Sequence, residues 1–137
     1  DRIGYETRVE EGLELSRYRI LPLLLQPVVE NAIIHGLDEK EEKGLIIISI
    51  RTKQEGEQNL LFIDVEDNGC GMTKETLDKL HQDIEIRDMS RSKSIGLYNI
   101  NQRMKLHYGN EHRIHLYAEQ GKGTRVRLAI PIEKMQK

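Results

Sequence analysis

Four runs rich in aliphatic and β-branched residues occur along the chain as two pairs, and a short turn joins the members of each pair. The first pair is Leu45–Thr52 and Leu60–Glu66, joined by the polar segment 55–59, and the second is Arg113–Glu119 and Thr124–Ile132, joined by Gly-Lys-Gly. Alternating side chains suit a pleated strand and glycine suits a tight turn, so each pair predicts a β-hairpin. The chain must therefore place two hairpins in a sheet.

Helical patterns lie before the first hairpin and between the two hairpins. Helices are predicted over 22–35, 73–82 and 96–107, and one further strand over 3–9. Thr73 is the expected N-cap of the second helix, and Gly109 is expected to end the third. One side of the third helix is predicted to carry Leu97, Ile100, Met104 and His107, of which His107 is expected to be solvated. This order of elements predicts an α+β fold, a two-layer α/β sandwich whose mixed sheet is covered on one face by helices.

Composition fits one soluble domain and excludes several classes of function. The chain has 137 residues, and its 21 basic and 23 acidic residues nearly cancel, so no nucleic-acid partner is expected. A single cysteine, Cys70, cannot form an internal disulfide. No apolar run approaches the roughly 20 residues that span a bilayer. Because the chain begins without Met, we expect a fragment, 1–137, of a longer protein.

The hexapeptide Asp67–Met72 directly follows a predicted strand. Its alternating glycines, Gly69 and Gly71, would let the backbone approach a flat ligand closely. The carboxylate of Asp67 could then accept a hydrogen bond from an exocyclic amine. An ordinary Asn-Gly turn explains the same residues.

The predicted helix over 22–35 is mostly apolar, and its last two turns carry the polar residues Glu30, Asn31 and His35. Asn31 and His35 share one helix face at a spacing of four. Polar groups buried without partners cost several kcal/mol, on the order of 2–7 each, so these residues need partners. The partners are either a core network or solvent at the helix end, or else a site in which the Asn31 amide oxygen ligates Mg²⁺ near phosphate oxygens.

Of two further motifs, one leads into a helix and the other joins the two strands of a hairpin. The stretch Lys93–Asn99 leads into the third helix, where backbone N–H groups bind phosphate well and the small residues Ser94 and Gly96 admit an anion. Ser94 acting as an ordinary N-cap is the alternative. The segment Gly121–Thr124 has the composition of a turn, but Thr124 would reach a nucleobase if its strand lies under the pocket.

Together and in this order, these motifs resemble the GHKL, or Bergerat-fold, ATP-binding domain shared by histidine kinases, gyrase-type ATPases, Hsp90 and MutL. The chain is most similar to the catalytic and ATP-binding domain of a sensor histidine kinase. Residues 21–36, LPLLLQPVVENAIIHG, resemble the LytS/YesM class in particular. The resemblance extends over most of the chain, from Tyr18 to Pro131, and implies ATP and Mg²⁺ as cofactors.

The resemblance also implies roles for individual residues. Asn31 would bind Mg²⁺ and, with His35, would form the catalytic end of the site near the phosphates. Asp67 would accept a hydrogen bond from the adenine amino group, and Thr124 would lie beneath the adenine. The remaining residues expected to bind the nucleotide are Gly69, Gly71, Met72, Lys93, Ser94, Ile95, Gly96 and Leu97. Residues 73–95, polar over their second half, would form the ATP lid.

Two departures from the family pattern bear on the reaction. Ser94 replaces the first glycine of a GxG, and Pro27 stands where gyrase-type relatives carry a water-activating glutamate. Because proline cannot act as a base, phosphoryl transfer to a separate acceptor is favoured over hydrolysis of ATP. The expected function is therefore a protein histidine kinase that presents the γ-phosphate to a histidine on an upstream dimerisation domain. A response regulator would be the next partner.

The expected setting is the cytoplasmic side of the bacterial cell membrane, within a membrane-anchored homodimeric parent protein. Two alternatives share the fold. One is a stand-alone serine kinase of the anti-sigma type, against which the pair Gln26–Pro27 and the missing start argue. The other is a nucleotide-sensing module without catalysis, against which the intact Asn31, Asp67 and Gly96 argue.

Overall fold

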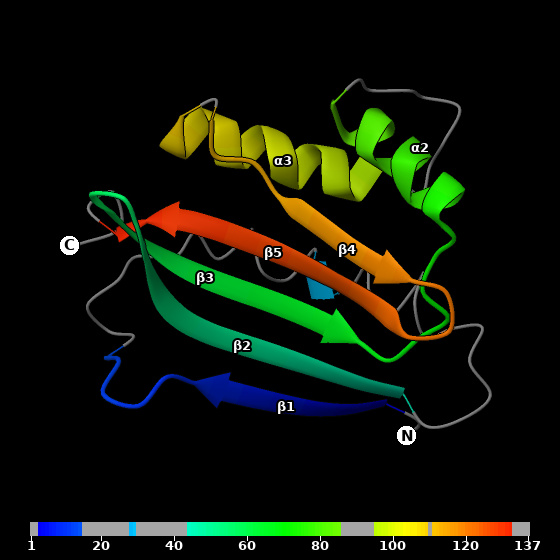
Figure 1. Cartoon of the computed structure of the whole chain (residues 1–137), viewed down its shortest axis with the longest axis horizontal. Helices are drawn as coiled ribbons and strands as arrows, with labels where there is room; N and C mark the ends of the chain where they lie inside the picture. The colour runs from blue at the N-terminus through cyan, green and yellow to red at the C-terminus, as the bar shows by residue number, and fades with distance from the viewer. Residues whose placement is uncertain (1–2, 15–27, 30–43, 86–94, 110, 133–137) are drawn as a thin grey trace.

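The computed structural model describes residues 3–14, 28–29, 44–85, 95–109 and 111–132. Its strands are β1 (Ile3–Val9), β2 (Gly44–Glu55), β3 (Gln58–Asp67), β4 (His115–Glu119) and β5 (Gly123–Pro131), and its helices are α2 (Lys74–Glu85) and α3 (Ile95–Tyr108). The strands form one sheet in the order β1-β2-β3-β5-β4 (Figure 1). β1 runs parallel to β2 and the other neighbours are antiparallel, so the predicted mixed sheet is confirmed.

Both predicted hairpins are present, and the first is longer than the side-chain pattern indicated. β2 and β3 pair from Ile46 opposite Asp67 to Glu55 opposite Gln58, around a turn in which Gly56 has a φ of 63°. The residues next to this turn are polar and pair through their backbone. Backbone pairing leaves no trace in a hydrophobic pattern, which explains the shorter predicted strands.

The hydrophobic core lies between one face of the sheet and the helices. Alternate residues of β3, for example Leu61 and Ile63, are completely buried on this face. They belong to one cluster with buried residues of α3, among them Ile100 and Met104. The predicted two-layer sandwich with helices on one face is therefore confirmed for the described elements. Of the predicted helix over 22–35, only Val28 and Val29 are among the described residues, and both are helical.

The two described helices differ from their predictions at their C-terminal ends. The buried side of α3 ends with Tyr108, and His107 is exposed, which confirms the expectation that it is solvated. A spacing of four from Met104 reaches position 108, so Tyr108 rather than His107 continues the buried side. α2 continues to Glu85, beyond the predicted end at residue 82, because Ile84 buries an apolar side chain in the last turn. Its predicted N-cap, Thr73, is confirmed: the Oγ1 atom accepts the Thr76 N–H at 3.2 Å.

A polar cluster around Glu85 connects α2 to α3. The carboxylate of Glu85 accepts hydrogen bonds from Lys105 Nζ at 2.7 Å, Arg113 Nη1 at 3.0 Å and Asn101 Nδ2 at 3.3 Å. Asn101 is completely buried, and its Oδ1 accepts the Ile114 N–H at 3.0 Å. A negative charge at a helix C-terminus is unfavourable by itself. These donors therefore compensate Glu85 and fix α2 against α3 and the start of β4.

The sheet face away from the helices is closed by its own side chains. Arg127 donates two hydrogen bonds to Asp64, at 2.7 and 2.9 Å. The guanidinium carbons of Arg51 and Arg127 lie 4.8 and 4.7 Å from the ring centroid of Phe62, which is 5% exposed. A desolvated cation above an aromatic ring is stabilising. The stems of these charged side chains therefore contribute to the burial of Phe62.

Stability should depend on pH through Glu85. Burial acts to raise the pKa of Glu85, but hydrogen bonds from Lys105 and Asn101 outweigh burial, and the pKa lies below its usual value of 4.5. A carboxyl with a lowered pKa in the folded state stabilises the fold above its unfolded pKa, and this contribution is lost as the pH falls through the folded pKa. We expect Glu85→Gln to lower the free energy of unfolding at pH 7 and to flatten its decline below pH 4.5. Urea denaturation of both chains between neutral and acid pH measures this, and parallel curves would contradict it.

Candidate functional site

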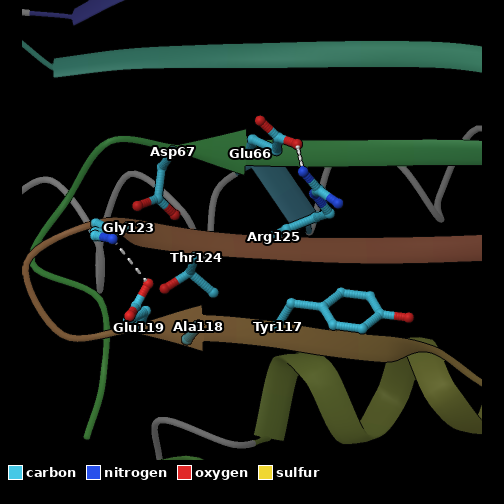
Figure 2. Close-up of a pocket in the computed structure, with 9 residues that line it drawn as sticks. Glu66, Asp67, Tyr117, Ala118, Glu119, Gly123, Thr124 and Arg125 are labelled. Atoms are coloured by element: carbon cyan, nitrogen blue, oxygen red, sulfur yellow. Dashed lines mark ion pairs between the residues drawn. The ribbon is translucent and has the colours of Figure 1, made fainter.

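Four residues form a row across the sheet on the face that carries the core. Asp67 is the last residue of β3, and its register partners are Ile46 on β2 and Thr124 on β5. Thr124 is in turn opposite Ala118 on β4. Asp67 is 8% exposed, and Figure 2 shows its carboxylate beside the side chain of Thr124. The end of β3 therefore places a nearly buried carboxylate next to a hydroxyl and a small methyl group.

The loop after β3 holds this carboxylate in place. Asp67 Oδ1 accepts the Gly69 N–H at 2.9 Å. The next residue, Asn68, accepts the Leu45 N–H at its Oδ1 at 2.8 Å, and its own N–H donates to the Leu45 oxygen at 3.3 Å. These bonds attach the loop to both β2 and β3. Asp67 is thus oriented by backbone groups before any ligand arrives.

Two glycines allow the β4–β5 turn to approach that loop. Gly71 has a φ of 68°, and a Cβ there would lie 2.0 Å from the backbone oxygen of Glu119. Gly123 has a φ of 94°, and a Cβ there would lie 2.0 Å from the backbone oxygen of Asp67. Between them, the Gly121 N–H donates to the Cys70 oxygen at 2.7 Å. Only glycine fits at positions 71 and 123, because any side chain would collide with backbone.

A pocket of about 320 Å³ lies at this meeting point, within the usual size of small-molecule sites. Ion pairs border it, between Lys122 and Glu119 at 3.4 Å and between Arg125 and Glu66 (Figure 2). It is lined by Glu66, Asp67, Tyr117, Ala118, Glu119, Lys122, Gly123, Thr124 and Arg125. A flat ring with an amino group suits this arrangement, because the glycine backbone admits a flat ring and Asp67 offers an acceptor.

The structure brings some predicted site residues together and does not describe others. Asp67 and Thr124 line the pocket, whereas Gly69, Gly71 and Met72 belong to the adjoining loop and are not among its lining residues. Ile95 and Gly96 begin α3, and Leu97 in the same turn is buried in the core. In Figure 1 this N-terminal end of α3 lies toward the same side of the molecule as the end of β3. The predicted residues that lie outside the described ones are Asn31, His35, Lys93 and Ser94.

Sequence reasoning missed Glu66 and Arg125, the neighbours of Asp67 and Thr124, and three further lining residues, Tyr117, Ala118 and Glu119. All three are on β4, opposite the strand that carries Thr124. The signal that could have found them was the predicted hairpin itself. A turn at Gly-Lys-Gly places the last residues of one strand opposite the first residues of the next, and therefore Ala118 opposite Thr124.

Comparisons with known proteins identify the family of the chain. The model of the family "Histidine kinase-, DNA gyrase B-, and HSP90-like ATPase" matches residues 20–134. The chain is 36% identical over 114 residues to the Bacillus subtilis protein YwpD, covering 81% of this chain and 38% of YwpD. It is 31% identical over 126 residues to the sensor protein kinase HptS of Staphylococcus aureus, covering 92% of this chain and 23% of HptS. The chain thus spans less than half the length of either relative.

Solved structures show the same fold. The histidine kinase domain of a blue-light activated histidine kinase from Erythrobacter litoralis superimposes with a TM-score of 0.58 at 19% identity. The alignment covers 97% of this chain and 53% of that chain. The structure of the whole Erythrobacter kinase gives a TM-score of 0.57 at 16% identity, over 98% of this chain and 36% of that one.

The two glycines of the β4–β5 turn provide a matched test of the close approach. Gly121 and Gly123 both have positive φ, but a Cβ at Gly121 meets nothing within 4 Å. We expect Gly123→Ala to destabilise the fold by about 1–3 kcal/mol more than Gly121→Ala, because Gly123→Ala also forces the turn away from Asp67. Urea denaturation of both variants measures the difference. Equal losses would show that the contact with Asp67 is not tight.

Proposed function

The chain belongs to the family of histidine kinase-, DNA gyrase B- and HSP90-like ATPases, and we propose that it is the ATP-binding catalytic domain of a sensor histidine kinase. The family implies ATP binding. The kinase assignment is supported by HptS, which by its name is a sensor protein kinase. Because the chain spans only 23% of HptS, the phosphoacceptor domain and the response regulator are part of the proposal.

The single observation that carries the proposal is the row formed by Asp67, Thr124 and Ala118. In the proposal, the Asp67 carboxylate accepts a hydrogen bond from the exocyclic amine of adenine, and the base lies over Thr124 and Ala118. The Gly69 N–H bond to Asp67 Oδ1 orients the carboxylate for this contact. Such an acceptor, 8% exposed, would discriminate against a base that presents an oxygen instead of an amine, since two acceptors repel.

The phosphates extend, in the proposal, toward the N-terminus of α3. Backbone N–H groups in the first turn of a helix favour anions, and α3 begins at Ile95. Asn31 would ligate Mg²⁺, with His35 near the phosphates; Mg²⁺ neutralises charge on the β- and γ-phosphates. Residues 73–95 would cover the bound nucleotide, with α2 as their first half. The proposed phosphate-binding residues are Lys93, Ser94, Ile95, Gly96 and Leu97, and Gly71 and Met72 would adjoin the base.

The proposed reaction transfers the γ-phosphoryl group to a histidine nitrogen supplied from outside this chain. A nitrogen–phosphorus bond forms, the bond from the γ-phosphorus to the bridging oxygen breaks, ADP leaves and the imidazole proton passes to solvent. This transfer needs positioning and charge neutralisation rather than a nucleophile from the binding domain. Pro27, in the place of a water-activating glutamate, supports transfer over hydrolysis.

The setting of the parent protein is part of the same proposal. We place the domain on the cytoplasmic side of the bacterial cell membrane, in a membrane-anchored homodimer of the LytS/YesM class. Across the described parts of the chain, no helix has the length and apolar character required to cross a bilayer.

Nucleotide binding should depend on the charge of Asp67. We expect Asp67→Asn to weaken ATP binding about 10- to 150-fold, the range for loss of a charge-assisted hydrogen bond. Isothermal titration with a non-hydrolysable ATP analogue, with and without Mg²⁺, measures this. Glu57→Gln is the matched control, because Glu57 is exposed in the β2–β3 turn, at the other end of β3 from Asp67, and does not line the pocket.

The ligand offers a second control for the same experiment. Inosine triphosphate carries an oxygen in place of the exocyclic amine, so wild-type chain should bind it more weakly than ATP, and Asp67→Asn should reduce that preference. Unchanged ATP affinity in Asp67→Asn, with the fold intact by circular dichroism, would contradict the adenine assignment.

A further inference from the structure

The outer edge of β1 is unpaired among the described strands and presents exposed side chains. β1 pairs with β2 over seven consecutive residues, from Ile3 opposite Gly44 to Val9 opposite Ile50. None of the other described strands pairs with its far edge, and Figure 1 shows β1 at the margin of the sheet. Tyr5 and Val9 are 57% and 40% exposed. A regular edge strand without proline offers its free N–H and C=O groups to another strand.

The hydrogen bonding to β2 shows which backbone groups face outward. The Glu10 N–H donates to the Ile50 oxygen at 2.9 Å. Because backbone groups alternate in direction along a strand, Glu6 and Arg8 share the direction of Glu10. Residues 5, 7 and 9 therefore direct their N–H and C=O groups to the open edge.

The sequence of β1 is complementary to itself when read in the opposite direction. If two copies pair antiparallel about Thr7, each Glu6 is directly opposite an Arg8, and each Tyr5 is directly opposite a Val9. Glu6 and Arg8 already form an ion pair within one chain, so both lie on the same face of the sheet. Opposite charges and aromatic with β-branched residues are favourable cross-strand pairs. Each residue from Tyr5 to Val9 thus meets a compatible residue.

We propose that the β1 edge docks a second copy of this chain, joining two five-stranded sheets into one. The outward residues 5, 7 and 9 would form three hydrogen-bonded pairs, and the charged residues would occupy the closer, non-hydrogen-bonded positions between them. The pocket lies on β3, β4 and β5, away from this edge, and stays open in the pair. The proposal does not rest on nucleotide binding and goes beyond it.

The self-complementary charges favour a second copy over an unrelated peptide. A peptide of other sequence would meet alternating negative and positive side chains and would need the inverse pattern, which β1 itself supplies. A single pair of seven-residue strands buries little surface, so the dimer should be weak and concentration-dependent.

Analytical ultracentrifugation of the whole 137-residue chain, from about 0.01 to 1 mM, tests the proposal. The weight-average mass should rise from 15.9 kDa toward twice that value. Glu6→Arg and Arg8→Glu should each weaken the dimer about tenfold or more, because like charges then face each other. Thr7→Pro, which removes an outward N–H without touching the bonds to β2, should do the same.

Mixing the two single variants provides the decisive experiment. The Glu6→Arg chain carries two positive charges at these positions and the Arg8→Glu chain two negative ones, so an equimolar mixture should form a heterodimer that neither variant forms alone. The double variant Glu6→Arg/Arg8→Glu should dimerise like wild type. Lys53→Glu, a charge reversal away from β1, should leave the dimer unchanged. A wild-type chain that stays monomeric at 1 mM, or single variants that dimerise as well as wild type, would overturn the proposal.

Discussion

The register between β3 and β5 is the constraint on which the site depends. Side chains alternate between the two faces of a strand, so a slip of one residue would turn Asp67 away from Thr124 and toward the helix-free face. The side chains of Leu61, Ile63 and Val65 oppose that slip, because it would remove all of them from the core at once and would turn neighbours such as Asp64 into it. Burial of apolar side chains therefore sets the position of the carboxylate at the end of the same strand.

The remaining features shape the end of β3 and its surroundings for a ligand. Gly71 and Gly123 let the β4–β5 turn close against the loop after β3, and the Gly69 N–H orients the Asp67 carboxylate. The Glu85 cluster fixes α2 on α3, the helix whose first turn is the proposed phosphate end of the site. On the opposite face, cationic side chains above Phe62 cover the sheet. One face thus carries the core and the row of Asp67, Thr124 and Ala118, while the other is closed by its own side chains around Phe62.

Much of this could be predicted from the sequence because the controlling signals are local. Side-chain alternation and glycine turns predicted both hairpins, and a hydroxyl at Thr73 predicted a helix start. What failed required partners distant in sequence: α2 extends to Glu85 because Ile84 reaches the core, and Tyr108, which no prediction placed there, fills the last buried position of α3. Ala118 was missed because its role comes from register rather than from its own chemistry. The roles of Asn31 and His35 stay predictions, since both lie outside the described residues.

The position of a bound nucleotide tests the central claim most directly. A crystal structure of the chain with Mg²⁺ and a non-hydrolysable ATP analogue should show the exocyclic amine of adenine within hydrogen-bond distance of an Asp67 carboxylate oxygen. The plane of the base should lie over Thr124 and Ala118, and the phosphates should point toward the first turn of α3. A nucleotide bound elsewhere, or a base whose amine contacts another residue while Asp67 faces solvent, would contradict the account.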